Sequence, residues 1–367
     1  VAREMGKGNY EYARRTFSFI VTAGFIFSFL FSGASYLFMD QIFAVLGADG
    51  ILYEYCYDYF LPLLFFLPAL MFQLLFEVYF VTAGHPKKGL ALVIAAGLTN
   101  AFLDYLFIVV MDMGIGGAAW ATGIGTTIPA VFGLVFFLKK DKFLYFTRPI
   151  IRLRILAEAS FNGASEMVTY MSTGFSTLLF NWTALLLLGI DGVAAVAILL
   201  YSEFLLNAVF YGFAQGIAPI ISYNHGCKNR VKLRGVVLIC IRFICIFSVI
   251  IFLVANLGAS VIVGIFTSRS AEVNSIALNG FWIFSFSFLF AGFNIFASSM
   301  FTALSNGKVS AFISFLRTVV FIGLGILLLP RYFDVNGLWL AMPTAEILSL
   351  MIAAFFVWRE YNRASGR

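Results

Sequence analysis

Residues 89–138 read GLALVIAAGLTNAFLDYLFIVVMDMGIGGAAWATGIGTTIPAVFGLVFFL, and their only charged side chains are Asp104 and Asp112. A transmembrane helix needs about 20 mainly apolar residues. Two segments of this stretch, 89–111 and 117–138, meet that requirement and are separated by a short loop. Helices joined by so short a loop are antiparallel neighbours, so the stretch predicts a transmembrane helical hairpin.

The same apolar pattern extends over the rest of the chain. Apolar residues make up 62% of the sequence and charged residues 11%, whereas a soluble domain has about 25% charged residues. Eight further segments are long and apolar enough to span a bilayer: 15–38, 56–80, 157–188, 193–222, 235–257, 276–303, 308–329 and 337–358. The sequence therefore predicts an all-α, polytopic membrane protein with ten transmembrane helices.

The basic residues indicate the orientation of these helices. Alternate loops and the two termini hold 20 of the 24 lysines and arginines, whereas the intervening loops hold only Arg269 and Arg331. Cytoplasmic loops are enriched in basic residues. We therefore expect a multi-pass protein of the plasma or inner membrane with both termini in the cytoplasm. Its net positive charge then faces the anionic leaflet of the lipid bilayer and does not indicate nucleic acid as a partner.

A weak internal repeat links the two halves at an offset of about 220 residues. The segment 6–9 (GKGN) matches 226–229 (GCKN), and 84–87 (GHPK) lies opposite 306–308 (NGK). A third match relates 116–121 (GGAAWA) to 336–341 (NGLWLA). The offset carries one cytoplasmic loop onto another, so the repeat is parallel, with its pseudo-two-fold axis along the membrane normal.

The repeat predicts two lobes of unequal length around a central cavity. The N-terminal lobe is 1–138, a basic cytoplasmic linker follows at 139–156, and the C-terminal lobe is 157–367. Two predicted spans precede the repeat motif at Gly226, and no counterpart precedes Gly6. If both lobes are built alike, we expect a complete protein of twelve helices, six in each lobe, of which this chain lacks the first two.

Three polar residues of the 89–138 hairpin form the first candidate site. Asn100 and Asp104 are one helical turn apart on the same face, and Thr122 is at a similar expected depth on the next helix. A carboxylate with neutral oxygen ligands suits Na⁺, and a desolvated carboxylate suits a proton. The alternative is a hydrogen-bonded cluster that only packs two helices together, and the residues alone leave both interpretations open.

The C-terminal lobe has a second group of intramembrane polar residues. Glu203 is expected deep in its span, where it could meet a cationic substrate. Further candidates for a substrate cavity are Glu166, which could instead pair with the basic linker, the adaptable apolar side chains of Met167 and Met171, and Gln215. Arg317 and Glu346 are in adjacent spans, and we expect them to form a structural ion pair.

The motifs of soluble enzymes are missing from the sequence. His85 and His225 are flanked by glycine, lysine and other residues that do not form a metal-binding pattern, and there is no HExxH, Walker or nucleophile-elbow motif. We therefore expect neither enzymatic activity nor a cofactor. A possible bound metal is limited to Na⁺ at Asp104.

Two longer stretches resemble the multidrug and toxic compound extrusion (MATE) family. One is 97–104 (GLTNAFLD) with 113–122 (MGIGGAAWAT), and the other runs from 192–197 (GVAAVA) through 215–219 (QGIAP) to 222–226 (SYNHG). The resemblance implies a twelve-helix exporter that exchanges small cationic amphiphiles for H⁺ or Na⁺. Asn100, Asp104 and Thr122 resemble the coupling-ion site of the DinF-type branch, which also uses an acidic residue on the first helix that this chain lacks.

Two other functions remain as alternatives. A flippase for lipids or lipid-linked oligosaccharides of the same superfamily is expected to have more basic residues facing its cavity, and only Arg242 and Arg317 are candidates here. An intramembrane enzyme needs a constellation of His, Asp or Ser at one depth, which is not apparent. We expect a monomeric transporter, without a prediction of which substrate it carries.

Overall fold

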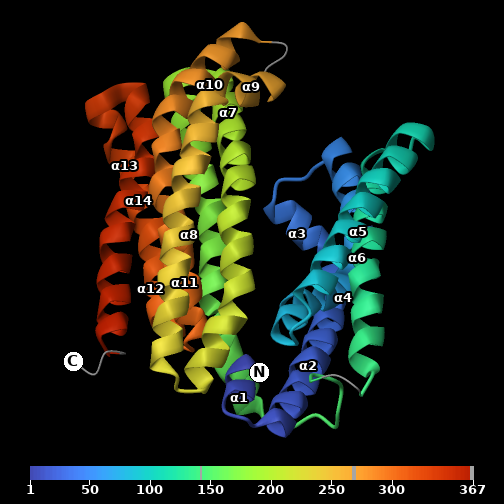
Figure 1. Ribbon diagram of the computed structural model, residues 1–367. Coiled ribbons are helices and arrows are strands. Elements are labelled where there is room, and N and C mark those ends of the chain that lie inside the picture. Colours follow the sequence, from blue (N-terminus) through green and yellow to red (C-terminus); the bar gives the residue numbers. More distant parts are fainter. Residues whose placement is uncertain (141–142, 267–269, 364–367) are drawn as a thin grey trace. The chain divides into compact units, whose positions relative to one another are not determined.

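The computed structural model describes residues 1–140, 143–266 and 270–363, which are almost entirely helical and contain no strand. Contacts between residues divide the chain into two compact units, Val1–Ile155 and Leu156–Arg367. Figure 1 traces the helices of each unit along the chain. The prediction of an all-α protein is confirmed.

The first unit contains six α-helices and one π-helical segment. They are α1 (Ala2–Gly6), α2 (Tyr10–Leu37), α3 (Met39–Val45), α4 (Ile51–Thr82), α5 (Pro86–Asp104), the π-helix η1 (Tyr105–Val110) and α6 (Gly114–Leu138). Helix α4 packs against α2 and α6, and α5 packs against α6. The rings of Phe17, Phe76, Phe80 and Phe137 form the core where α2, α4 and α6 meet.

The segment after α6 is attached to this unit. The side chain of Arg14 donates from Nε to the carbonyl of Phe143 at 2.9 Å, and the amide of Thr147 donates to Ser18 Oγ at 2.8 Å. The amide of Phe146 donates to the carbonyl of Phe137, also at 2.9 Å. These contacts hold the first part of the predicted linker against α2 and α6.

The second unit begins with a very long helix and continues through shorter ones. They are α7 (Leu153–Gly226), α8 (Arg230–Leu257), α9 (Ala259–Phe266), α10 (Ala271–Phe284), the 3₁₀ turn η2 (Ser285–Ser287), α11 (Phe288–Ala303), α12 (Gly307–Phe315), the π-helix η3 (Leu316–Phe321), α13 (Ile322–Leu328) and α14 (Pro330–Arg363). The largest buried side chains of its core include Phe210, Phe281, Phe284, Phe288 and Trp339.

The predicted spans correspond to these helices. Nine helices in the described part of the chain are long and apolar enough to cross a membrane. One of them, α7, has 74 residues and contains a non-helical residue, Gly189, with φ 69° and ψ −155°. The two parts of α7 on either side of Gly189 correspond to the predicted spans 157–188 and 193–222, so all ten spans have a helix.

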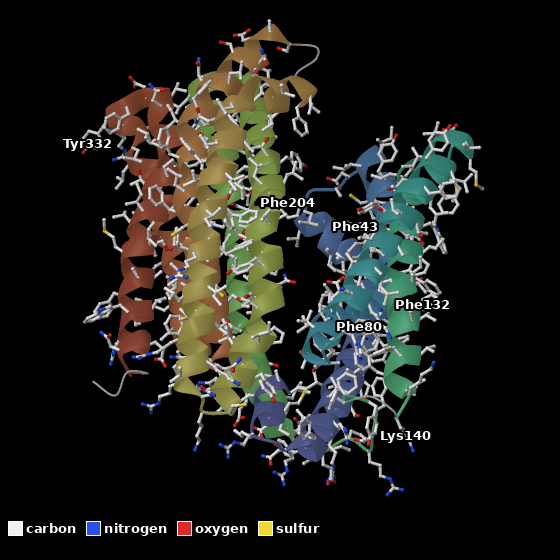
Figure 2. All side chains as sticks on the ribbon, in the orientation of Figure 1. Phe43, Phe80, Phe132, Lys140, Phe204 and Tyr332 are labelled. Carbon is white, nitrogen blue, oxygen red and sulfur yellow. The ribbon has the colours of Figure 1, made fainter. Side chains whose placement is uncertain are left out.

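Aromatic side chains occur both in the cores and on the outer faces of the helices. Phe43 and Phe80 are buried, whereas Phe132 is 60% exposed and Phe204 is 74% exposed (Figure 2). Exposing so many large apolar side chains to water would be costly. Their exposure is consistent with helices whose surroundings are hydrocarbon.

The internal repeat is visible in the backbone turns between helices. Positive φ angles occur at Gly8 and Lys228, at Gly84 and Ser305, and at Gly114 and Asp334. The members of these pairs are 220, 221 and 220 residues apart. The two halves therefore turn at equivalent places in the chain, as the sequence repeat predicts.

Candidate functional site

A close approach of α5 and α6 positions the first candidate site. A Cβ atom added to Gly125 of α6 would lie 3.0 Å from the carbonyl oxygen of Ala96 and 3.1 Å from Cβ of Asn100. A side chain at this position would be crowded, so glycine favours the close packing of the two backbones. Asn100 donates from Nδ2 to Thr122 Oγ1 at 3.4 Å, so the structure brings together two members of the predicted trio.

Asp104 is the last residue of α5, and the π-helix η1 begins at the next residue. Its Oδ1 atom is buried and has no hydrogen-bond partner among the described residues. π-Helical turns inside α-helices are frequent at functional sites. A buried carboxylate oxygen without a partner is costly, so Asp104 has an unfilled capacity to bind a cation or a proton.

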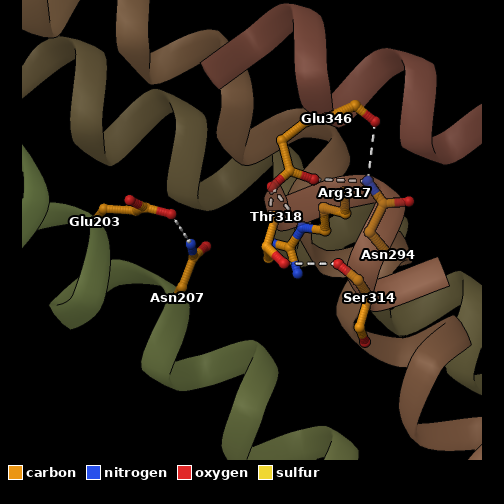
Figure 3. A network of polar contacts seen from close by, with 7 residues as sticks. All are labelled: Glu203, Asn207, Asn294, Ser314, Arg317, Thr318 and Glu346. Carbon is orange, nitrogen blue, oxygen red and sulfur yellow. Dashed lines mark hydrogen bonds and ion pairs between the residues drawn. The ribbon is translucent and has the colours of Figure 1, made fainter. Parts of the chain in front are cut away.

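The second candidate site is a small polar cavity in the second unit. The cavity has a volume of about 130 Å³, and its lining includes Glu203, Asn207, Tyr211, Arg317 and Thr318. Asn207 donates from Nδ2 to Glu203 Oε1 at 3.3 Å (Figure 3), and its Oδ1 atom is buried without a partner among the described residues. Glu203 therefore lies beside a cavity that Arg317 also lines, and Asn207 is its hydrogen-bond partner.

Arg317 also belongs to a buried network of hydrogen bonds and an ion pair with Glu346. Its guanidinium donates from Nε to Glu346 Oε1 at 2.8 Å, and Nη2 of Arg317 is 2.6 Å from the same oxygen. Asn294 donates from Nδ2 to Glu346 Oε2 at 2.6 Å (Figure 3), and Glu346 is fully buried. The contact predicted between Arg317 and Glu346 is present, and both carboxylate oxygens of Glu346 have partners.

The other candidates for the substrate cavity are elsewhere on α7. Glu166, Met167, Met171 and Gln215 are exposed, and none of them lines the cavity beside Glu203. They remain predictions.

Sequence reasoning missed two residues, Asn207 and Asn294. Asn207 follows Glu203 by one helical turn, the same spacing that relates Asn100 to Asp104, so this signal was present in the sequence. Asn294 is 52 residues from Glu346, and no sequence pattern connects them.

Comparison with known proteins shows the family of this chain. The MatE family model matches residues 1–106 and 166–327. The multidrug export protein MepA of Staphylococcus aureus (strain bovine RF122 / ET3-1) is 24% identical over 375 residues, covering 98% of this chain and 79% of MepA. MepA of Staphylococcus saprophyticus is also 24% identical, over 361 residues, covering 96% of this chain and 76% of that protein.

Solved structures of transporters share the fold. An outward-facing multidrug resistance MATE family transporter of the MOP superfamily matches with a TM-score of 0.94 and 19% identity, covering 100% of this chain and 82% of that one. The Vibrio cholerae MATE transporter VcmN, in its bent form, matches with a TM-score of 0.84 and 23% identity, covering 99% of this chain and 82% of that one. With a family model that matches more than half of its residues, the chain belongs to the MatE family of membrane transporters.

Proposed function

We propose that this protein exports small cationic amphiphiles in exchange for H⁺ or Na⁺, and that Asp104 is the residue that binds the coupling ion. The observation that carries the proposal is the buried Oδ1 of Asp104, which has no partner among the described residues. The contact between Asn100 and Thr122 one turn away supports it. The names of the MepA relatives, multidrug export proteins, support transport out of the cell and a broad range of substrates.

The physical basis of coupling is the cost of burying a charge. An ionised carboxylate in a low-dielectric setting is destabilising unless a proton or a cation neutralises it. Asp104 with a bound ion and Asp104 without one are therefore most stable in different protein conformations. An ion that binds one conformation more tightly shifts the population toward that conformation. Two lobes that move relative to a site near the bilayer midplane can convert this preference into alternating access.

Glu203 is proposed to attract the positive charge of the substrate. Its cavity of about 130 Å³ is smaller than the 300–1,000 Å³ or so typical of sites for drug-sized ligands. It therefore has room for a cationic head and not for a whole amphiphile. Met167 and Met171, with Glu166 and Gln215, are proposed to form further parts of the substrate path along α7.

The flippase alternative has less support. A phosphate-bearing substrate would need free basic groups at the cavity, and the guanidinium of Arg317 already contacts Glu346. Breaking that ion pair would leave a buried carboxylate uncompensated, which is costly.

The test is transport of a fluorescent organic cation into proteoliposomes under separate pH and Na⁺ gradients. In the Asp104→Asn variant we expect gradient-driven transport to fall at least about tenfold, because the titratable charge is removed while the shape is kept. Asp112→Asn is the matched control, since Asp112 is exposed in the turn after η1, and it should transport normally. Normal transport by Asp104→Asn would contradict the proposal.

We also propose that the transporter works as a monomer with both termini in the cytoplasm. The asymmetry of the basic residues supports this orientation. In a variant whose four native cysteines are replaced by serine, single cysteines introduced at Lys87 and Lys308 should react with a membrane-impermeant maleimide only in inverted vesicles. Cysteines introduced at Asp112 and Asp334 should react only in right-side-out vesicles. Reaction of one residue from the opposite side would refute the assigned topology.

A further inference from the structure

An apolar groove runs along the outer face of the second unit. Helices α8 and α14 both pack against α11, and the groove between them has a volume of about 340 Å³. Phe296, Ala297 and Ala353 are buried at its base, and the exposed side chains of Leu238, Ala354 and Trp358 form its sides. The lining is apolar, and its small residues Ala297, Ala353 and Ala354 leave room for a hydrocarbon chain.

The groove continues into a smaller pocket with charged residues. Val237 and Val357 line both, and the smaller pocket also contains Arg234 and Glu360. These residues are near the first residue of α8 and the last turns of α14. Charged residues at the ends of transmembrane helices, with a tryptophan such as Trp358 beside them, are typical of the boundary between hydrocarbon and water.

Basic residues outnumber acidic ones at this end of the groove. Arg230, Lys232, Arg234 and Arg359 belong to the same two helix ends, and Glu360 is the acidic residue that lines the pocket. A ligand that contacts this end should therefore carry negative charge.

Arg242 adds an independent observation. It is exposed on α8, one turn beyond Leu238 and on the same side of the helix. It has no hydrogen bond or ion pair with another described residue. Twelve residues separate it from the start of α8, which is about 18 Å along the helix axis, so its charge is costly in hydrocarbon unless it reaches an anion. Side chains of a helix point toward its N-terminus, which directs Arg242 back toward the start of α8 and the basic end of the groove.

We propose that this groove binds one anionic phospholipid, with an acyl chain between α8 and α14 and the phosphate held by Arg242. A second copy of the chain is a poorer occupant, because a two-fold contact would place the same basic residues opposite each other. A phospholipid with a choline headgroup fills the groove equally well, but its own positive charge offsets the phosphate. The proposal concerns lipid binding and is independent of the transported substrate.

Binding can be measured by native mass spectrometry of the delipidated protein titrated with dioleoylphosphatidylglycerol or dioleoylphosphatidylcholine. We expect the protein to bind phosphatidylglycerol about fivefold or more tightly than phosphatidylcholine, and Arg242→Gln to lose about fivefold of the phosphatidylglycerol affinity. Arg331→Gln is the matched control, because Arg331 is also exposed but is at the other end of α14. Equal affinity for the two lipids, or an equal loss in both variants, would overturn the proposal.

A second variant tests the groove without changing charge. Ala354→Phe places an aromatic ring in the groove from an exposed position, so the core of the unit is left intact. We expect it to reduce binding of both lipids, while Ala91→Phe, at an exposed position of α5 in the first unit, leaves binding unchanged. Unchanged lipid binding by Ala354→Phe, or dimerisation through this face in place of lipid binding, would disprove the assigned occupant.

Discussion

The two units differ in whether the buried oxygen atoms of a carboxylate have partners. In the first unit, Asp104 has a buried oxygen without a partner among the described residues. In the second unit, both oxygens of Glu346 are engaged, one by Arg317 and the other by Asn294. The carboxylate of Asp104 therefore has an unsatisfied oxygen, whereas Glu346 already has an internal cation, Arg317.

The difference stands out because the surrounding helices are alike. In each unit a helix that contains a π-helical segment, η1 or η3, packs against the helix that follows it. At the repeat offset of 220 residues, however, Asp104 falls on Leu324, so the acidic residue has no charged counterpart there. The comparison suggests that the first unit provides exchangeable binding and the second a fixed charge that positions its helices.

Removing the positive charge of Arg317 should have the largest effect on stability. Arg317→Leu leaves Glu346 buried and unpaired, and we expect the free energy of unfolding to fall by about 3–5 kcal/mol. Thermal unfolding in detergent can measure the change. The double variant Arg317→Leu/Glu346→Leu should recover most of the loss, because no buried charge remains. If the single variant were as stable as the wild type, the assigned structural role would be wrong.

Removing a neutral ligand from the first unit should have an intermediate effect, on coupling and not on folding. We expect Asn100→Ala and Thr122→Ala each to raise the Na⁺ or H⁺ concentration for half-maximal transport about fivefold to tenfold, which corresponds to one lost hydrogen bond or ligand. Unfolding temperatures measured alongside should change little. A large drop in stability without a change in ion dependence would favour the helix-packing interpretation of this cluster.

The smaller of the two expected effects on stability comes from the helix contact that positions the first site. Gly125→Ala inserts a methyl group 3.0 Å from the carbonyl of Ala96, and such overpacking costs about 1–3 kcal/mol. Gly97→Ala is the matched control on α5, since no atom lies within 4 Å of its added Cβ. Comparing the unfolding of the two variants checks whether the close approach matters. Equal stability of the two variants would show that the contact between α5 and α6 tolerates an added methyl group.

Much of the fold could be predicted from hydropathy, because length and apolar content define a membrane helix almost completely. Helix ends could not be placed as well. Helix α2 begins at Tyr10 and α8 at Arg230, about five residues before the predicted spans. Polar residues in the first turn remain helical since water and headgroups can surround them, and hydropathy does not detect that extension.

The candidate site could be predicted only in part. The spacing of Asn100 and Asp104 predicts a shared helix face, and the equivalent spacing of Glu203 and Asn207 holds the same information. The two π-helical segments and the contact of Asn294 with Glu346 depend on how distant helices pack. A single sequence without tertiary contacts does not contain a local pattern for them.

The shared turns of the two halves have a consequence for engineering the protein. The first half uses glycine at Gly8, Gly84 and Gly114, while the second half uses Lys228, Ser305 and Asp334, all with a positive φ. That conformation costs an L-residue about 1–2 kcal/mol. At these three turns the second half keeps a local strain that glycine avoids in the first half. Placing glycine at Lys228, Ser305 and Asp334 therefore offers a route to a more heat-resistant transporter that leaves its polar sites untouched.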